Sequence, residues 1–360
     1  MSTSRPSSRT DSDRPPLKRP RLDTDSLPNN PLKGKLRPKE PRDTVQISTW
    51  NVAGLYSCNA EKWKFGFRLY VEAEDAHILA ITEVNEKDAA GVFEKDDNFA
   101  FLRERYPYRY WSPKVAILSK FKPIAPAVYG FPEGTKCDSE VEAESRAITL
   151  EFKQLFILAT YVPNSGTNFK SLDRRKKWNA DFEQHIRVLD GTKPVIWTGD
   201  FNVVRPYTTP APSGAHRPNP HTPDVQWPQN WRRLSGTHEE EIKAHERLLG
   251  AQEELRHPRR PGRRFVDVWR LINGEGKREY THTSKSHGGW RLDGFIVSER
   301  FLYRVRKCEI RYSVKEEFFP TPDVVRLGAL SDHWPVWLSL EMERSDFEAD
   351  GEKEGGNVSI

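Results

Sequence analysis

The chain has 360 residues, of which 36% are hydrophobic and 30% charged, so it can bury one large core while long segments stay solvated. No stretch approaches the roughly 18 consecutive apolar residues of a membrane span, and the polar N-terminal sequence differs from a secretory signal, so we expect no membrane partner. Cys58, Cys137 and Cys308 are widely spaced, which excludes a disulfide framework and a CxxC zinc site.

The two ends of the chain carry opposite charge. Residues 1–43 contain eleven Lys and Arg, six Asp and Glu, and no aromatic residue, so they are predicted to be a disordered basic tail. Lys18, Arg19 and Arg21 slightly favour a nuclear import signal, and hence a nuclear and also cytoplasmic protein, over a phosphate-binding arm or a solvated basic run. Residues 342–360 are predicted to be an acidic disordered tail, which leaves one folded domain at residues 44–341.

Apolar periodicity divides this domain into strands and helices. Short apolar runs bounded by turn residues predict strands at residues 45–55, 76–82, 115–119, 147–152, 155–162 and 195–203. Helical spacing of apolar side chains predicts two surface helices, at residues 173–190 and 237–255. Residues 205–235 form a proline-rich insert whose arginines and tryptophans favour contact with nucleic acid. A second series of mostly extended segments follows, at residues 265–272, 291–298, 307–314 and 334–342.

Polar side chains recur where the apolar segments end or beside the turns that follow. They are Asn51, Glu83, Tyr161, Asn164, Asp200, Asn202, Asp293, Asp332 and His333. A scaffold that gathers strand ends at one rim would place carboxylates for a hard cation beside amides and one imidazole. Asn51, Glu83 and Asp332 supply the oxygen ligands that Mg²⁺ prefers. This combination is typical of phosphate ester hydrolysis, although most of these residues taken singly are also common in turns.

In chain order, the segments ISTWNVAGL, ILAITE, VAILSK, YVPNSG, DRRKKW, KPVIWTGDFNV, GWRLDGFIVS and LSDHWPV resemble the landmarks of the exonuclease III class of apurinic/apyrimidinic (AP) endonucleases. The resemblance covers about residues 45–341, and YVPNSG and GWRLD are its specific pieces. It implies a four-layered α/β sandwich, in which two mixed β-sheets pack face to face between outer helices. It also implies a monomeric, magnesium-dependent DNA phosphodiesterase, with Mn²⁺ as a substitute metal, whose partner is duplex DNA carrying an abasic site.

The resemblance also assigns roles to the matching positions. The metal-site residues of the class match Asn51, Glu83 and Asp332. The catalytic residues match Asp200, Asn202, Asp293, His333 and Tyr161. Asp200, held by Asn202, resembles the group that orients and deprotonates the attacking water. His333, whose ring Asp293 fixes, resembles the residue that binds the phosphate and stabilises charge in the transition state. The remaining phosphate contacts match Tyr161 and Asn164.

The sequence departs from the class pattern at three places. The metal-site glutamate is usually found in Gln-Glu-Thr-Lys, whereas here residues 82–85 read Thr-Glu-Val-Asn, so the hydrogen-bonding frame of Glu83 is altered. YRYWSPK replaces the Gly-rich loop expected before residue 115, which puts that part of the DNA contact in doubt. In the abasic-sugar pocket Trp290 and Leu292 are kept, but His282 stands where an aromatic is expected, so discrimination of a missing base should be weaker.

Three functional hypotheses follow. The leading one is an AP endonuclease of base excision repair that cleaves 5′ to abasic sites, with an accompanying 3′–5′ exonuclease or 3′-phosphodiesterase activity. The second is a less selective DNA-nicking endonuclease, or another phosphoesterase of the same superfamily. The third is a catalytically weakened DNA-binding paralogue, which the altered frame around Glu83 keeps open.

Overall fold

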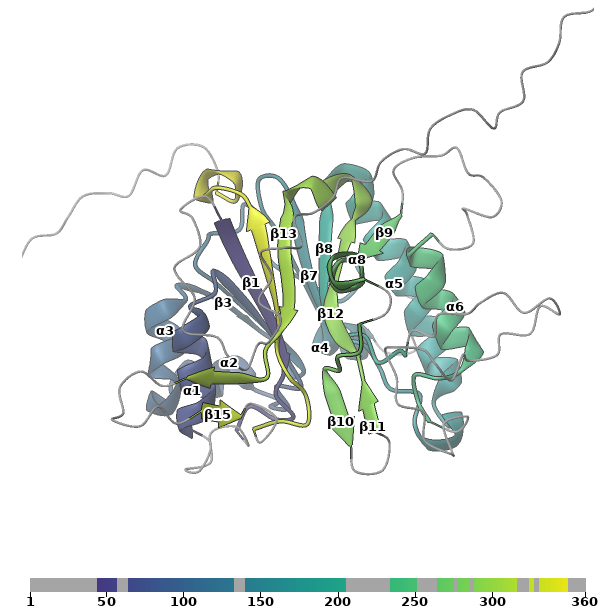
Figure 1. The fold of residues 1–360 in the computed structure, drawn as a ribbon, viewed down its shortest axis with the longest axis horizontal. Coiled ribbons are helices and arrows are strands. Elements are labelled where there is room, and N and C mark those ends of the chain that lie inside the picture. The colour runs from purple at the N-terminus through teal and green to yellow at the C-terminus, as the bar shows by residue number, and fades with distance from the viewer. Residues whose placement is uncertain are drawn as a thin grey trace, which may run out of the picture.

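The apolar strand segments assemble into two six-stranded sheets that pack against each other in the middle of the molecule (Figure 1). The computed structural model describes residues 44–56, 64–132, 140–204, 234–250, 264–274, 277–284, 288–315, 324–326 and 330–348. The predicted basic tail with its proposed import signal, residues 205–233 of the proline-rich insert, and residues 349–360 lie outside this part of the chain.

The first sheet has the strand order β13, β16, β1, β2, β4, β3. Only β1 and β2 are parallel neighbours within it, and α1 (Lys64–Glu74) supplies the crossover that a parallel pair requires. Its strands are β1 (Thr44–Asn51), β2 (Ile78–Thr82), β3 (Tyr108–Trp111), β4 (Val115–Ser119), β13 (Val305–Ile310) and β16 (Val336–Glu341).

The second sheet has the order β5, β6, β7, β8, β12, β9, and its parallel neighbours β7 and β8 are connected through α5 (Leu172–Thr192). Its strands are β5 (Val128–Tyr129), β6 (Ala147–Glu151), β7 (Phe156–Tyr161), β8 (Val195–Asp200), β9 (Phe265–Asp267) and β12 (Asp293–Ser298). Two short antiparallel pairs join β10 (His282–Ser284) to β11 (Gly288–Trp290) and β14 (Ser313–Lys315) to β15 (Val324–Arg326).

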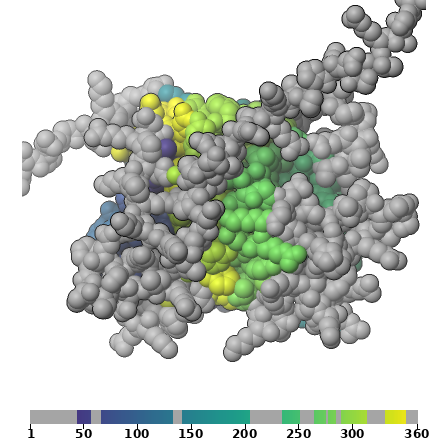
Figure 2. All heavy atoms as spheres, in the orientation of Figure 1, coloured from purple at the N-terminus to yellow at the C-terminus, as the bar shows by residue number. Residues whose placement is uncertain are grey.

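Helices cover the outer face of each sheet. On the first sheet lie α1, α2 (Ala89–Phe93) and α3 (Ala100–Arg105), and on the second lie α5 and α6 (Glu239–Leu248) (Figure 1). The other helices are α4 (Glu140–Arg146), α8 (Val268–Asn273), and the 3-10 helices η5 (Asp97–Phe99), η6 (Thr167–Phe169), η8 (Glu299–Arg304) and η10 (Arg344–Asp346). None of the helices in the described ranges has the length and hydropathy needed to cross a bilayer. In the space-filling view, the described surface facing the reader comes mainly from the C-terminal half of the chain (Figure 2).

Three apolar layers hold this arrangement together. Between the sheets, the fully buried side chains of Ile47 and Ile117 meet those of Ile157 and Phe295. Outside the first sheet, Trp50 packs with α1, and outside the second, Trp197 packs with α5. Burial of each such side chain contributes about 1.5–3 kcal/mol. The prediction of two packed sheets flanked by helices is therefore confirmed.

The structure differs from the sequence prediction in several elements. Helices α1 to α4 were not predicted, because their short apolar stripes are interrupted by charged residues. The segment at residues 265–272, expected to be extended, is a strand only to Asp267, whose carboxylate then accepts a hydrogen bond from the Arg270 backbone N–H and caps α8. Met342 and Phe347 are buried in the core between the sheets, so ordered structure continues past the predicted boundary at residue 341.

Candidate active site

The strand ends that carry the predicted site residues lie at one rim of the sandwich. In the second sheet, Tyr161 and Asp200 are register partners on the parallel strands β7 and β8. Because β12 is antiparallel to β8, its first residue, Asp293, lies directly opposite Asp200. In the first sheet, Asn51 is the register partner of Thr82, the residue before Glu83. This rim is the lower end of the sheets in Figure 1, beside β10 and β11.

Asn51 joins the two sheets at this rim. Its side-chain Nδ2 donates to Glu83 Oε1 at 3.1 Å and to Asp200 Oδ2 at 3.0 Å, while its Oδ1 accepts from the Ala53 backbone N–H at 3.0 Å. The Ser331 hydroxyl donates to the Asn51 carbonyl at 2.7 Å, which fixes the segment that carries Asp332 beside it. Residues 149 positions apart in the chain therefore share one hydrogen-bonding group.

The end of β8 aims Asp200 by backbone geometry. Gly199 has φ +122°, and a Cβ built there would lie 2.1 Å from the Thr160 carbonyl oxygen, so only glycine fits. The Asn202 backbone N–H donates to Asp200 Oδ1 at 2.8 Å, and the Asn202 amide donates to the Val162 carbonyl at 2.9 Å. Asn202 itself adopts φ +45°. Asn202 therefore contacts both the Asp200 carboxylate and the loop after β7.

His333 and Asp293 form a buried pair next to Asp200. His333 Nδ1 lies 2.7 Å from Asp293 Oδ2, which leaves Nε2 directed away from the pair. Burial by itself would lower the pKa of His333, but the charge and hydrogen bond of Asp293, with Asp200 and Asp332, raise it above its ordinary 6.5. Burial and then the Asp293 charge raise the pKa of Asp200 from 3.8 to about 7. The cluster thus pairs a cationic imidazole with a strengthened base.

Tyr161 presents a neutral phenol to the same cluster. Burial, followed by the charges of Glu83 and Asp200, raises its pKa well above 10, so the hydroxyl keeps its proton. The guanidinium of Arg146, at the end of α4, lies 4.8 Å from the Tyr161 ring centroid. Arg146 was not singled out from the sequence, because nothing in its local pattern distinguishes it from a surface arginine. Asn164 is exposed, and its Oδ1 accepts from the Gly166 backbone N–H at 2.7 Å.

The frame around Glu83 is built from residues that the class pattern does not contain. Asn85 Nδ2 lies 3.4 Å from Glu83 Oε2, and Lys114 Nζ donates to Asn85 Oδ1 at 2.7 Å. Glu83 adopts φ +55°, a left-handed conformation that is costly for a non-glycine residue and is often found at functional sites. In this chain Asn85 and Lys114 therefore form the polar surroundings of Glu83.

The oxygen donors at this rim fit a hard divalent cation. The carboxylates of Glu83 and Asp332 and the carbonyl oxygen of Asn51 form the kind of donor set that Mg²⁺ selects. Asn51 and Glu83 are in direct contact, whereas Asp332 is half-exposed and lies 3.4 Å from His282 Nε2. Within the described residues, Oδ1 of Asp293 is buried without a hydrogen-bond partner, so one acceptor of the adjoining cluster is left unsatisfied.

The residues predicted to line the sugar pocket lie next to the catalytic cluster. Trp290 and Leu292 are buried and pack with Val204 and Leu234, which flank the proline-rich insert. His282 forms an antiparallel bridge with His333, and the two ring centroids are 4.6 Å apart. The histidine that replaces the expected aromatic therefore contacts His333 and Asp332 of the candidate site.

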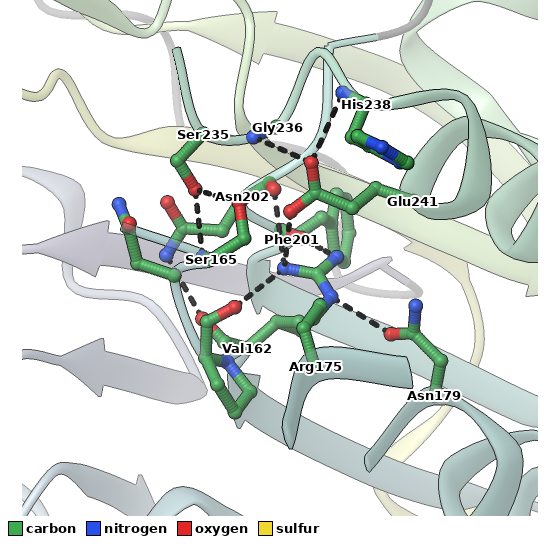
Figure 3. A network of polar contacts seen from close by, with 12 residues as sticks. Val162, Ser165, Arg175, Asn179, Phe201, Asn202, Ser235, Gly236, His238 and Glu241 are labelled. Carbon is green, nitrogen blue, oxygen red and sulfur yellow. Dashed lines mark hydrogen bonds and ion pairs between the residues drawn. The ribbon is translucent and has the colours of Figure 1, made fainter. Parts of the chain in front are cut away.

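A buried arginine, Arg175 of α5, secures the loops that follow β7 and β8 (Figure 3). Its guanidinium donates to the backbone carbonyls of Pro163, Asn202 and Phe201 at 2.6, 3.2 and 3.0 Å. Glu241 of α6 lies 4.0 Å away and accepts from the Gly236 and His238 backbone N–H groups. The Arg175 side chain is only 3% exposed, although the DRRKKW segment indicates a charged helix surface.

Comparison with known proteins agrees with this geometry. Residues 48–333 match the model of the Endonuclease/Exonuclease/phosphatase family. The chain belongs to that family. It is 30% identical to a DNA-(apurinic or apyrimidinic site) endonuclease of Dictyostelium discoideum over 85% of this chain and 73% of that protein, and 28% identical to an exodeoxyribonuclease of Bacillus subtilis over 83% and 100%. An AP endonuclease structure from Archaeoglobus fulgidus has the same fold, with a TM-score of 0.57 and 22% identity over 82% of this chain and 98% of that one.

Membership of the exonuclease III class, inferred above from YVPNSG and GWRLD, is confirmed by these relatives, and so is the prediction of an enzyme that hydrolyses phosphate esters. The structure brings Asn51, Glu83, Asp200, Asp293 and His333 into one cluster, as the family resemblance implied.

Proposed function

We propose that this protein is a magnesium-dependent DNA phosphodiesterase, and that it cleaves 5′ to abasic sites as an AP endonuclease of base excision repair. The observation that carries the proposal is that a carboxylate base, an imidazole and a metal-type carboxylate meet at one rim. Asp200 lies beside the Asp293–His333 pair. Asn51 links Asp200 to Glu83. In-line attack on phosphorus needs a base for the water, donors for the phosphate oxygens and compensation of charge, and this cluster contains all three.

Asp200 is assigned the role of accepting the proton from the attacking water. Its raised pKa makes the carboxylate a stronger base than an exposed aspartate, and Asn202 and Asn51 fix both of its oxygens. A proton acceptor works only when it is correctly aimed, and three hydrogen bonds to backbone and amide groups restrict Asp200 to one orientation.

His333, Tyr161 and Asn164 are assigned to the phosphate. The His333 imidazolium is kept charged by Asp293 and offers its Nε2 proton to a phosphate oxygen, where negative charge grows during the reaction. Tyr161, at the end of β7, keeps its phenolic proton and is assigned to donate it in a hydrogen bond to another phosphate oxygen. The Asn164 amide nitrogen is available because its oxygen is engaged with Gly166. The sugar face is assigned to Trp290, Leu292 and His282.

Asn51, Glu83 and Asp332 are assigned to Mg²⁺, with Mn²⁺ as a substitute. When bound, the cation offsets phosphate charge and stabilises the leaving 3′ oxygen. The proposed function also includes an accompanying 3′–5′ exonuclease or 3′-phosphodiesterase activity, and action as a monomer. We further propose a nuclear location through Lys18, Arg19 and Arg21, which lie outside the described residues.

A less selective DNA-nicking activity is the second candidate, and His282 favours it. A polar imidazole in contact with Asp332 replaces the apolar ring that would select an extrahelical abasic sugar by shape and apolar contact.

The decisive experiment incubates the purified protein with three substrates, in the presence of magnesium or of chelator. They are a duplex with one abasic-site analogue, the undamaged duplex, and an inositol phosphate. We expect magnesium-dependent cleavage of the first duplex alone. Equal cleavage of both duplexes would replace this proposal with the nicking endonuclease, and hydrolysis of the inositol phosphate alone would exclude both.

The catalytic assignment is tested with Asp200→Asn, which should lower kcat by at least about 10²-fold because the proton acceptor is lost. Asp346→Asn, an aspartate in η10 far from the rim, is the matched control and should keep full activity. Full activity of Asp200→Asn would contradict the assigned role.

A further inference from the structure

A second group of ligating side chains, which shares only Asp332 with the proposed magnesium donors, lies at the same rim. His282, Asp332 and His333 each offer one ligand atom, and these atoms all lie within 4.8 Å of one another. Two of the three are imidazoles, which suit borderline transition metals and not magnesium. The magnesium assignment above uses Asp332 but leaves His282 without a role toward a cation.

The backbone holds the two imidazoles in place before any ligand arrives. His282 and His333 are partners in an antiparallel bridge, the Thr283 backbone N–H donates to the Asp332 carbonyl at 3.0 Å, and the Trp334 backbone N–H donates to the Thr281 carbonyl at 2.7 Å. The three residues therefore sit on paired backbone on both sides, and a ligand would not have to order a loop. Such preorganisation lowers the entropic cost of binding.

The distance between His282 and Asp332 fits tetrahedral zinc coordination better than it fits a strong hydrogen bond. His282 Nε2 and Asp332 Oδ2 are 3.4 Å apart, which is long for a hydrogen bond. Zinc bonds of about 2.0 Å at tetrahedral angles place neighbouring ligand atoms about 3.3 Å apart. His282 and Asp332 therefore already stand at the separation of two zinc ligands.

The second imidazole, that of His333, has the support that metal-bound histidines usually have. His333 Nδ1 lies 2.7 Å from Asp293 Oδ2, and this carboxylate fixes the ring and leaves Nε2 as the nitrogen that can bind a metal. Asp332 is 57% exposed, so the open side of the group is reachable from solvent. Three protein ligands with one open position is the arrangement of catalytic, not structural, zinc sites.

We propose that His282, Asp332 and His333 form a binding site for a transition metal, specifically Zn²⁺, that shares Asp332 with the magnesium assignment but uses neither Asn51 nor Glu83. The fourth position is left for water or a phosphate oxygen. Zinc replaces the Nε2 proton of His333, so binding releases a proton. The site depends on the His282 substitution of this chain, and it requires neither DNA nor the phosphodiesterase activity proposed above.

The test is direct zinc binding to the full chain, measured by competition with a chromophoric chelator in excess magnesium and without DNA. The wild-type protein should bind one more equivalent of zinc than His282→Phe, which restores an aromatic at this position. Asp293→Asn should keep all three ligands but bind this zinc about 10-fold to 100-fold more weakly, because the carboxylate supports His333 without touching the metal.

Glu83→Gln is the matched control, since it removes a magnesium donor and leaves the three zinc ligands intact, and it should bind zinc as the wild type does. As a second readout, visible absorption of bound Co²⁺ should show a low-coordinate site in the wild type that is missing in His282→Phe. Equal zinc stoichiometry in wild type and His282→Phe would overturn the proposal, and so would loss of the same zinc in Glu83→Gln. Because no substrate is present, failure of the proposed nuclease activity would leave this result unaffected.

Discussion

At the scale of single residues, the site works by placing a charge next to a group whose protonation it controls. Asp293 lies opposite Asp200 on the neighbouring strand and 2.7 Å from His333. Its charge therefore acts on both groups, raising the pKa of the imidazole and that of the second carboxylate. One buried carboxylate thus keeps a hydrogen-bond donor and a proton acceptor side by side in the forms that phosphate hydrolysis needs.

Asp293→Asn should reverse this effect at His333. Without the negative charge, burial dominates and the pKa of the imidazole should fall below its wild-type value, while kcat should drop by about 10²-fold to 10⁴-fold. NMR titration of the His333 ring measures the first effect independently of activity. A His333 pKa that does not change in the variant would show that Asp293 does not set its charge.

At the scale of elements, α5 links the outer layer to the catalytic loops. Arg175 reaches from the buried side of this helix to carbonyls in the loops after β7 and β8, which carry Asn164 and Asn202. Burial lowers the pKa of Arg175 from 12.5 to about 10, with Glu241 opposing the shift, so the guanidinium remains charged at neutral pH. The two loops are consequently held by a fixed donor and not only by their own turns.

Arg175→Met should leave several buried carbonyls without a donor and Glu241 without its counter-charge. We expect a loss of about 3–5 kcal/mol in the free energy of unfolding, measured by urea denaturation, and a lower kcat with little change in KM where the variant is folded. Arg187→Met on the same helix is the control: Arg187 pairs with Glu183 at the surface, and we expect a change of less than about 1 kcal/mol. Similar losses in the two variants would contradict the special role of Arg175.

At the scale of the whole molecule, stability depends on polar groups enclosed between the layers. His185 of α5 lies against β6, with its Nε2 3.2 Å from the Thr149 hydroxyl and its ring 5.3 Å from that of Phe131. Burial lowers the pKa of His185 from 6.5 to about 4, so the folded protein keeps this imidazole neutral in mildly acidic solution. The unfolded chain, where the histidine is solvated, takes up the proton near pH 6.5.

Acidification should therefore destabilise the fold through His185. Between pH 6.5 and pH 4 the unfolded state binds one proton that the folded state does not. The free energy of unfolding therefore decreases as the pH is lowered, by at most about 3 kcal/mol from this residue. Urea denaturation across this range should show a flatter pH dependence for His185→Gln than for the wild type. Parallel curves for the two proteins would rule out the contribution of His185.

The sequence by itself determined the strand segments, the residue types at their ends and the class of fold. Alternating and continuous apolar runs such as those of β7 and β8 are local patterns, and Gly199 with Asp200 and Asn202 forms a local turn whose demands are visible in GDFN. The family pieces YVPNSG and GWRLD then placed the candidate residues in order along the chain.

Only the tertiary structure decided which of these residues touch. The Asn51–Asp200 bond, the burial of Arg175 in a charged helix, and the bridge between His282 and His333 depend on strand register and on the packing of two sheets. Such contacts join positions far apart in the chain, and no local periodicity encodes them, because a strand pattern fixes which face is buried but not which neighbour lies across from it.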